Sequence, residues 1–333
     1  MSNKLYLECY SGISGDMLVA SLLDLGADEK VLMDVLNSLP LGGFHVNISR
    51  VLKSGIDACD FDVVLENQDN HDHDMEYLYG HLHGEHASVH EHIHDHEHTH
   101  GHGHGEDHEH THGHGHGEDH EHTHGHGHDE DHEHTHGHDE EHQHSHDHEH
   151  GEEHHDNHTN HHHEHRGMRE ITEIINKGTM TDGARKLALR IFDILAHAES
   201  KAHNVPVDEV HFHEVGAVDS IVDIVSIAVC IDNLDIKDCV VTHLTEGKGT
   251  VRCQHGILPV PVPAVLHVVS DNRIPIEITD ISGELVTPTG AASVAAICTS
   301  HELPKTFKVA KVGLGAGKRQ YECAGILRAM LIE

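Results

Sequence analysis

Five potential metal ligands lie within a thirteen-residue stretch of this chain: His211, His213, Glu214, Asp219 and Asp223. If residues 210–213 are extended, His211 and His213 project from one side, because strand side chains alternate. Asp219 and Asp223 would share a helix face, where two carboxylates repel unless a cation is near. Such a cluster could bind a divalent metal and leave one side chain for acid–base work. In the local alternative, Asp219 complements a helix dipole and the histidines are polar loop residues.

A second source of metal ligands is a tract in which histidine alternates with Asp, Glu, Gly or Thr. Residues 71–165 hold 39 of the 48 histidines, and the unit DHEHTHGHGH begins at Asp95, Asp107 and Asp119 and returns shortened at Asp131. Imidazole suits nickel, copper and zinc alike, and the Irving–Williams order places copper above nickel at an unconstrained site. The composition therefore predicts metal binding of low selectivity, with a solubilising linker as the alternative.

The same tract dominates the charge of the chain. It contains 26 Asp and Glu but no Lys or Arg, within a chain of net charge −37. A surface of this sign repels nucleic acid and anionic membranes and concentrates divalent cations. It also lacks the apolar area needed to offset the entropy of ordering, which predicts a disordered insertion over residues 67–165.

A Gly-rich turn near the N-terminus could bind phosphate. The candidate binding residues are Ser11, Gly12, Ser14, Gly15 and Asp16. Backbone N–H groups where a strand meets a helix, together with two hydroxyls, suit a phosphate, and glycines permit its close approach. The carboxylate of Asp16 opposes an anion unless a metal intervenes, so the alternative is a simple helix cap.

Two later segments carry weaker signals. Cys253-Gln-His255-Gly256 is predicted to be a turn, and His255 is a further candidate metal ligand. The segment 313–317 is also read as a turn. It does not complete a P-loop, because Gly317-Lys318 is followed by Arg319. A P-loop metallochaperone is thereby excluded.

The remaining sequence divides into an α/β segment at 1–66 and a second at 166–333, which are expected to pack together. Seven scattered cysteines without a C-x-x-C pair favour reduced thiols. With neither a signal peptide nor a membrane-spanning stretch recognised, a cytoplasmic location is expected.

Alternating strands and helices predict an α/β or α+β fold interrupted by the His-rich insertion. Strands are expected at 4–9, 45–52, 60–65, 239–244, 274–278, 305–312 and 326–331. Helices are expected at 16–25, 28–39, 168–176, 182–203, 218–234, 263–269 and 289–298. These elements must bring the candidate residues together.

Several motifs in this order resemble the LarC family of nickel insertion proteins: SGISGDM, HFHEVGAVDSIVDI, CQHGILPVPVPA, GELVTPTGAA, GLGAGKR and ILRAMLIE. The resemblance covers residues 4–66 and 166–333. It implies a nickel chelatase, of the lyase class, acting on pyridinium-3,5-bisthiocarboxylic acid mononucleotide. Nickel would be bound by two thiocarboxylate sulfurs and by ring carbon C4, giving the nickel-pincer cofactor of lactate racemase-type enzymes.

This resemblance suggests roles for the candidate residues. His213 or Glu214 would accept the C4 proton. His211, His213, Asp219 and Asp223 would bind nickel before its transfer to sulfur, and the turn from Ser11 to Asp16 would hold the phosphate.

Full-length relatives continue into a C-terminal domain that binds CTP with Mg or Mn, and this chain is expected to lack it. A C-terminal LarC polypeptide, a lactate racemase-type client and a homo-oligomer are the expected partners. The alternatives are a non-catalytic store of nickel or another divalent metal and a zinc or copper detoxification protein.

Overall fold

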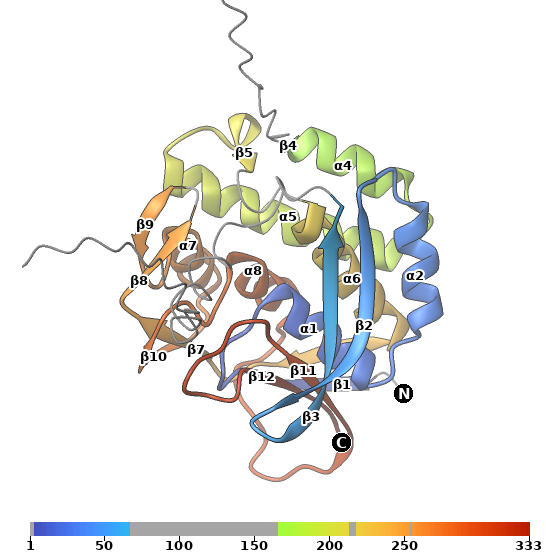
Figure 1. Cartoon of the computed structure of the whole chain (residues 1–333), viewed down its shortest axis with the longest axis vertical. Helices are drawn as coiled ribbons and strands as arrows, with labels where there is room; N and C mark the ends of the chain where they lie inside the picture. Colours follow the sequence, from blue (N-terminus) through green and yellow to red (C-terminus); the bar gives the residue numbers. More distant parts are fainter. Residues whose placement is uncertain (1–2, 67–165, 213–217, 254) are drawn as a thin grey trace, which may run out of the picture. The chain divides into compact units, whose positions relative to one another are not determined.

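The computed structural model describes residues 3–66, 166–212, 218–253 and 255–333 (Figure 1). The His-rich tract, and with it the predicted disordered insertion, lies outside these residues. Within the described part, helices and strands are mixed, which confirms the predicted fold class.

A six-stranded sheet joins the two segments that flank the tract. Its strand order is β2 (Phe44–Lys53), β3 (Ile56–Leu65), β11 (Val309–Ala316), β12 (Ile326–Ile332), β1 (Asn3–Glu8) and β6 (Ile236–Val240). Strand β1 pairs antiparallel with β12 and parallel with β6, and β11 pairs parallel with β3. Residues 3–66 and 166–333 thus share one sheet.

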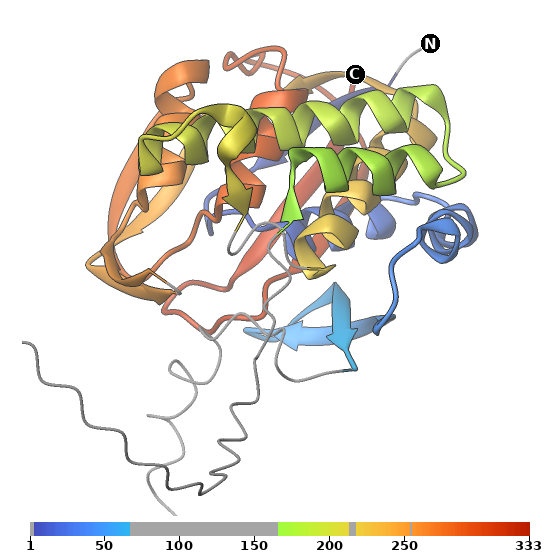
Figure 2. The ribbon, with the colours of Figure 1, turned by 90° about the horizontal axis from the view of Figure 1, so that it is seen from above.

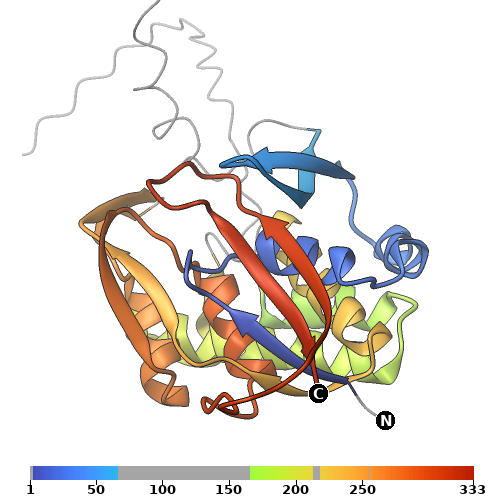
Figure 3. The same cartoon turned by 90° about the horizontal axis from the view of Figure 1, so that it is seen from below.

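The helices gather on one side of this sheet. They are α1 (Gly15–Asp24), α2 (Glu29–Ser38), α4 (Met168–Lys177), α5 (Asp182–His203), α6 (Val218–Asn233), α7 (Pro263–Asn272) and α8 (Pro288–Ile297). Seen from above, α4 and α5 are foremost (Figure 2), whereas from below β1, β11 and β12 are foremost (Figure 3). Helix α6 is buried over most of its length between α1 and α5, as its nearly continuous apolar sequence requires.

Helix α1 packs directly on β11 because two glycines open the surface of that strand. A Cβ atom on Gly313 would lie 2.2 Å from the Ser21 carbonyl oxygen, and one on Gly315 would lie 2.0 Å from that of Met17. The expectation of a turn at 313–317 is therefore wrong for residues 313–316, which belong to β11. Close approach of a helix backbone explains these glycines.

Short strands complete the described part. Strand β7 (Leu244–Lys248) pairs parallel with β10 (Ile276–Ser282), β8 (Thr250–Cys253) forms a hairpin with β9 (Gly256–Pro259), and β4 (Arg166–Gly167) pairs with β5 (His211–Phe212). The single strand predicted at 239–244 is wrong, because the chain leaves the large sheet after Val240 and enters a second sheet at Leu244.

Short-range sequence patterns predicted most helix boundaries well. Asp28 caps α2 by accepting hydrogen bonds from the amides of Lys30 (2.9 Å) and Val31 (3.2 Å). Helix α5 has the predicted bounds. Among the helices that the structure describes, none is both long enough and apolar enough to span a lipid bilayer.

Candidate functional site

A cavity of about 560 Å³ gathers residues from both flanking segments. Of the eleven predicted site residues, those that line it are Ser11, Ser14, Gly15, Asp16, Asp219, Asp223 and His255. His213 and Glu214 lie outside the described residues, as does the side chain of His211. The structure therefore brings the described candidate ligands and most of the phosphate-turn residues to one cavity.

Four helices begin at this cavity. The residues of their first turns and caps that line it are Ser14, Gly15, Asp16 and Met17 of α1, Asp219 and Ser220 of α6, Val262, Pro263 and Ala264 of α7, and Thr287, Pro288 and Thr289 of α8. The N-terminal end of a helix carries partial positive charge. An acidic residue lies in the first turn of α1 and of α6, whereas α7 and α8 have none there.

The turn predicted to hold phosphate is closed by its own contacts. The Gly12 amide donates to the Cys9 carbonyl (3.1 Å), and the Ile13 amide donates to the Leu285 carbonyl (2.9 Å). Gly12 has a φ of +81°, and a Cβ there would lie 2.1 Å from the Leu285 oxygen. Gly12 is therefore required for packing, and it is not among the residues that line the cavity.

Asp16 occupies the start of α1. Its Oδ1 accepts hydrogen bonds from the Ser14 hydroxyl and from the Met17 amide (2.8 Å). The carboxylate thus takes one amide of the first turn of α1, whose N-cap residue is Ser14, and both the phosphate role and the capping role of this turn stay predictions. Burial raises the pKa of Asp16, although the hydrogen bond from Ser14 opposes that shift.

Asp223 faces the same helix end from α6. A Cβ on Gly15 would lie 2.4 Å from Asp223 Oδ2, so only glycine leaves room for this carboxyl group. Its Oδ1 is buried and accepts no hydrogen bond from the described residues. Burial, followed by the charges of Asp16 and Asp219, raises the pKa of Asp223 well above its usual range. A cation would relieve this repulsion.

Asp219 lies one turn before Asp223 and also accepts a hydrogen bond from the Ser220 amide (2.8 Å). The position of Asp219 is therefore compatible with both predictions. It can complement the dipole of α6, and it lies on the same helix face as Asp223. In β5, Phe212 packs edge-on against Phe192 of α5, with ring centroids 6.1 Å apart. This contact anchors the chain immediately before the region of His213 and Glu214.

His255 lies in the turn of the β8–β9 hairpin and contacts α5. Its ring centroid is 4.9 Å from that of His203, the last residue of α5. His203 Nε2 lies 3.4 Å from Glu199 Oε2. Glu199, His203 and Cys253 also line the cavity. Sequence reasoning missed His203, although a Glu-x-x-x-His spacing at a helix end could have indicated it.

Two cations also line the cavity, and the charge of Lys318 acts on Asp16 and Asp223, where it opposes the rise in their pKa values. Lys318 Nζ contacts Asp60 Oδ1 (3.0 Å) and Asp62 Oδ1 (2.9 Å) of β3. Burial alone would lower the pKa of Lys318, but its hydrogen bonds with Asp62 and Asp60 outweigh burial and raise it. The structure therefore keeps Lys318 charged.

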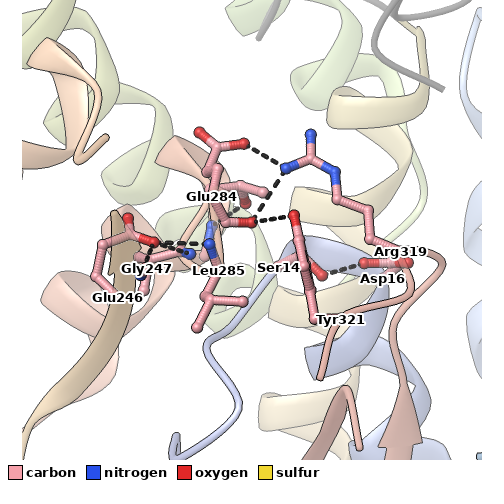
Figure 4. Close-up of polar contacts among 11 residues, drawn as sticks. Ser14, Asp16, Glu246, Gly247, Glu284, Leu285, Arg319 and Tyr321 are labelled. Carbon is pink, nitrogen blue, oxygen red and sulfur yellow. Dashed lines mark hydrogen bonds and ion pairs between the residues drawn. The ribbon is translucent and has the colours of Figure 1, made fainter. Parts of the chain in front are cut away.

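Arg319 and Tyr321 converge on Glu284 (Figure 4). Arg319 Nη1 donates to Glu284 Oε2 (2.8 Å) and to the Glu284 carbonyl (3.1 Å), which also accepts the Tyr321 hydroxyl (2.7 Å). Burial would lower the pKa of Arg319, but the charge of Glu284 outweighs burial and raises it. Sequence reasoning missed this role, although the consecutive cations Lys318 and Arg319 could have indicated it.

Glu246 of β7 holds the chain that leads into α8 (Figure 4). Its Oε1 accepts hydrogen bonds from the amides of Gly247 (2.8 Å), Leu285 (2.6 Å) and Val286 (3.2 Å). Its Oε2 is buried and has no hydrogen-bond partner among the described residues. Burial raises the pKa of Glu246, although these amides oppose the shift. Nothing in the local sequence distinguished this glutamate.

The cavity does not contain a ready-made coordination shell within the described part of the chain. No group of three or more His, Cys, Asp or Glu side chains among the described residues has an arrangement that could hold a metal ion. The predicted ligand set includes groups beyond these residues, so it remains a prediction.

Comparison with known proteins identifies the family. The family model described as nickel insertion protein matches residues 5–333. A pyridinium-3,5-bisthiocarboxylic acid mononucleotide nickel insertion protein of Alkaliphilus metalliredigens is 45% identical, covering 100% of this chain and 61% of that relative. A protein of the same name from Clostridium acetobutylicum is 37% identical, covering 99% of this chain and 64% of that relative.

A third relative with this name, from Acetivibrio thermocellus, is 31% identical over 98% of this chain and 60% of its own length. The chain thus spans about three fifths of the length of these relatives. No solved structure matches it. The family match over nearly the whole chain agrees with the shared motifs, and the chain belongs to the nickel insertion protein family.

Proposed function

We propose that this chain binds nickel and inserts it into pyridinium-3,5-bisthiocarboxylic acid mononucleotide within the cavity, as a nickel chelatase of the lyase class. The observation that carries the proposal is that two of the four helix starts at the cavity have an acidic residue in their first turn and the other two have none. Asp16 and Asp219 occupy the starts of α1 and α6 and lie beside Asp223, whereas the starts of α7 and α8 carry no acid. One wall suits a cation and the other suits an anion.

The acidic wall is the proposed nickel side. Asp223 presents a buried oxygen without a hydrogen-bond partner among the described residues, and its charge is opposed by two neighbouring carboxylates. A divalent ion would satisfy that oxygen and remove the repulsion. His211, His213 and His255 remain the proposed imidazole ligands, and Asp16 joins this wall rather than a phosphate cradle.

The opposite wall is the proposed site of the mononucleotide phosphate. Each helix start contributes about 0.3–1 kcal/mol toward binding of an anion. Lys318 is paired with Asp60 and Asp62, and Arg319 is paired with Glu284, so these five side chains add no net positive charge. The proposed attraction for the phosphate therefore comes from the starts of α7 and α8.

The proposed chemistry needs a base as well as a metal site. When the bond between nickel and ring carbon C4 forms, the C4–H bond breaks, its electron pair becomes the carbon–nickel bond and its proton goes to a base. His213 or Glu214 would accept that proton. Asp219 and Asp223 would hold the ion until the softer thiocarboxylate sulfurs take it.

We further propose that CTP with Mg or Mn takes part in the reaction through a C-terminal LarC polypeptide and that a lactate racemase-type enzyme receives the product. None of the seven cysteines forms a disulfide, which supports a cytoplasmic location. We also propose that the chain forms a homo-oligomer.

The histidine content of residues 71–165 favours a second candidate, a nickel store. The two functions separate when a variant lacking these residues is mixed with nickel, CTP, Mg, the precursor and a C-terminal polypeptide from a full-length relative. The readout is activation of apo lactate racemase. At saturating nickel an insertion enzyme retains its activity, whereas loss of all activity together with most bound nickel would support storage.

A further inference from the structure

Tyr321 is the one tyrosine that the described part of the chain contributes to the lining of the cavity. It lies in the connection between β11 and β12. The described lining contains one other phenyl-type ring, that of Phe61, and this side chain is fully buried. Tyr321 is only partly buried, so its ring is the aromatic surface that a ligand in the cavity can reach.

Two contacts fix the phenol ring in place. Its hydroxyl donates a hydrogen bond to the Glu284 carbonyl (2.7 Å), as Figure 4 shows. A Cβ on Gly283 would lie 2.6 Å from Tyr321 Cε1, so a side chain at this position would displace the ring. Gly283 also has a φ of +117°, which favours glycine. A ring held in this way loses little further freedom when a ligand binds against it.

The hydrogen bond also affects the electron density of the ring. Burial raises the pKa of the Tyr321 hydroxyl, although the charge of Arg319 opposes the shift, so the phenol keeps its proton at neutral pH. A phenol that donates this proton to a carbonyl gains electron density in its ring, which strengthens the negative potential of the ring face. Cations are attracted to such faces.

Backbone connections place the ring near both the proposed phosphate wall and the proposed nickel wall. Glu284, whose carbonyl holds the phenol, precedes the Thr287 cap of α8 by three residues, a span of at most about 10–11 Å. The next residue, Leu285, accepts a hydrogen bond from the Ile13 amide in the turn that leads into α1 (2.9 Å). A ligand with its phosphate at α8 and its metal-binding groups at α1 would therefore have its middle part near Tyr321.

The precursor in the names of the relatives carries a cation in this middle part. Its ring is a pyridinium, which has a fixed positive charge. We propose that the ring face of Tyr321 binds this pyridinium by a cation–π contact and thereby selects the charged ring over a neutral one. The inference rests on the proposed function for the identity of its ligand. Tyr321 would determine specificity, and it would be neither a base nor a metal ligand.

Two ligands that differ in ring charge test this contact. The probe is the oxygen analogue of the precursor, with carboxylates in place of the thiocarboxylates, titrated into the whole chain by calorimetry in EDTA. Its pyridinium form is compared with its dihydropyridine form, which has the same sugar and phosphate but a neutral ring. Wild type should bind the pyridinium form more tightly. Because the aspartates of the cavity also sense the ring charge, the decisive quantity is the change in this preference between variants.

Variants of two tyrosines give the comparison. Tyr321→Leu should reduce the preference for the pyridinium form about 5- to 30-fold, because a partly desolvated cation–π contact is lost. Tyr321→Phe should keep most of the preference, since the ring face remains. Tyr10→Leu should leave it unchanged, because Tyr10 stacks on His243 and does not line the cavity. Equal weakening of both ligand forms by Tyr321→Leu would give the ring a purely structural role and overturn the proposal.

Fluorination provides a test that leaves the shape of the side chain nearly unchanged. Phenylalanine with one, two or three ring fluorines is incorporated at position 321, and each fluorine withdraws electron density from the ring face. Affinity for the pyridinium form should fall stepwise along the series, whereas affinity for the dihydropyridine form should stay constant. A flat series for the pyridinium form would contradict the contact even if Tyr321→Leu does not fold. Thermal unfolding of each variant identifies any loss of fold.

Racemase activation separates this contact from the proposed function. If the ring preference behaves as expected but no racemase is activated, the pyridinium contact stands and the proposed function fails. If Tyr321→Leu supports activation with an unchanged KM for the precursor, the contact fails and the proposed function stands. A wild-type chain that shows no preference for the pyridinium form would also overturn the contact.

Discussion

The starts of α1 and α6 differ from those of α7 and α8 in one respect that matters for binding. Each of the first pair carries an aspartate in its first turn, and each of the second pair begins with proline and has no acid there. All four ends face one cavity. Similar helix dipoles can therefore serve opposite charges, because the side chains of the first turn decide whether the partial positive charge is already neutralised.

The buried charged side chains near α8 and near α1 also differ from each other. Near α8, Arg319 neutralises Glu284, and both side chains are largely buried. Near α1, Asp223 keeps an oxygen without a hydrogen-bond partner among the described residues. A buried charge with a partner is tolerated, whereas one without a partner either takes up a proton or binds a cation. This orphaned oxygen is the reason for proposing the metal ion on the acidic side.

The largest expected effect comes from removing one partner of the buried Arg319–Glu284 ion pair. Arg319→Ala should lower the free energy of unfolding by about 3–5 kcal/mol, because it leaves the Glu284 carboxylate buried without its partner. Urea unfolding of the metal-free chain measures this loss. Arg319→Met combined with Glu284→Gln should recover most of it. The exposed Arg50→Ala should cost no more than about 1 kcal/mol. Equal losses for Arg319 and Arg50 would contradict the distinction.

Removing a charge from the aspartates near α1 and α6 should have the opposite effect on the free energy of unfolding. Asp223→Asn should leave the stability unchanged or increase it, because it removes a carboxylate that is repelled by Asp16 and Asp219. Nickel insertion should fall about 100-fold, since the proposed metal-binding carboxylate becomes a neutral amide. Thermal unfolding and racemase activation are measured together, with Asp34→Asn on the exposed face of α2 as the control. Destabilisation with full activity would make Asp223 a structural residue.

A charge placed at the other helix start tests the anion wall. Thr287 caps α8 by accepting a hydrogen bond from the Gly290 amide (3.2 Å), and aspartate caps helices equally well. Thr287→Asp should therefore preserve the fold but weaken binding of the anionic precursor about 10-fold. Asp28→Thr exchanges the same residue types at the start of α2, outside the cavity, and should not change binding. Calorimetric titration with the precursor distinguishes the two variants.

The smallest expected effect is a pH dependence at Glu246, which holds the chain entering α8. Its folded pKa is raised by burial, so the native state holds the proton over a pH range where the unfolded state has released it. The stability that this proton provides is present below the ordinary Glu pKa of about 4.3 and is lost as the pH rises through the folded value. The free energy of unfolding of wild type, relative to that of Glu246→Gln, should fall over that pH range. If this difference in the free energy of unfolding did not change with pH, the buried proton would belong to a group other than Glu246.

Short-range patterns predicted much of the secondary structure but less of the site. The cap at Asp28 and the full extent of α5 follow from side chains acting within one helical turn. Lys318, Arg319 and Glu284 were missed because their partners are distant in the sequence. The β8–β9 hairpin was missed for a related reason, since its four-residue strands give little periodicity to detect.

The sequence by itself determined the family, the alternation of helices and strands, and the unusual supply of imidazoles, because shared motifs and composition are properties of the chain alone. Only the tertiary structure decided that Asp16 lies close to Asp223, that His255 meets His203, and that glycines of 313–316 lie under α1. These are contacts between segments far apart in the chain. Their geometry depends on how one sheet and its helices pack, which no local pattern records.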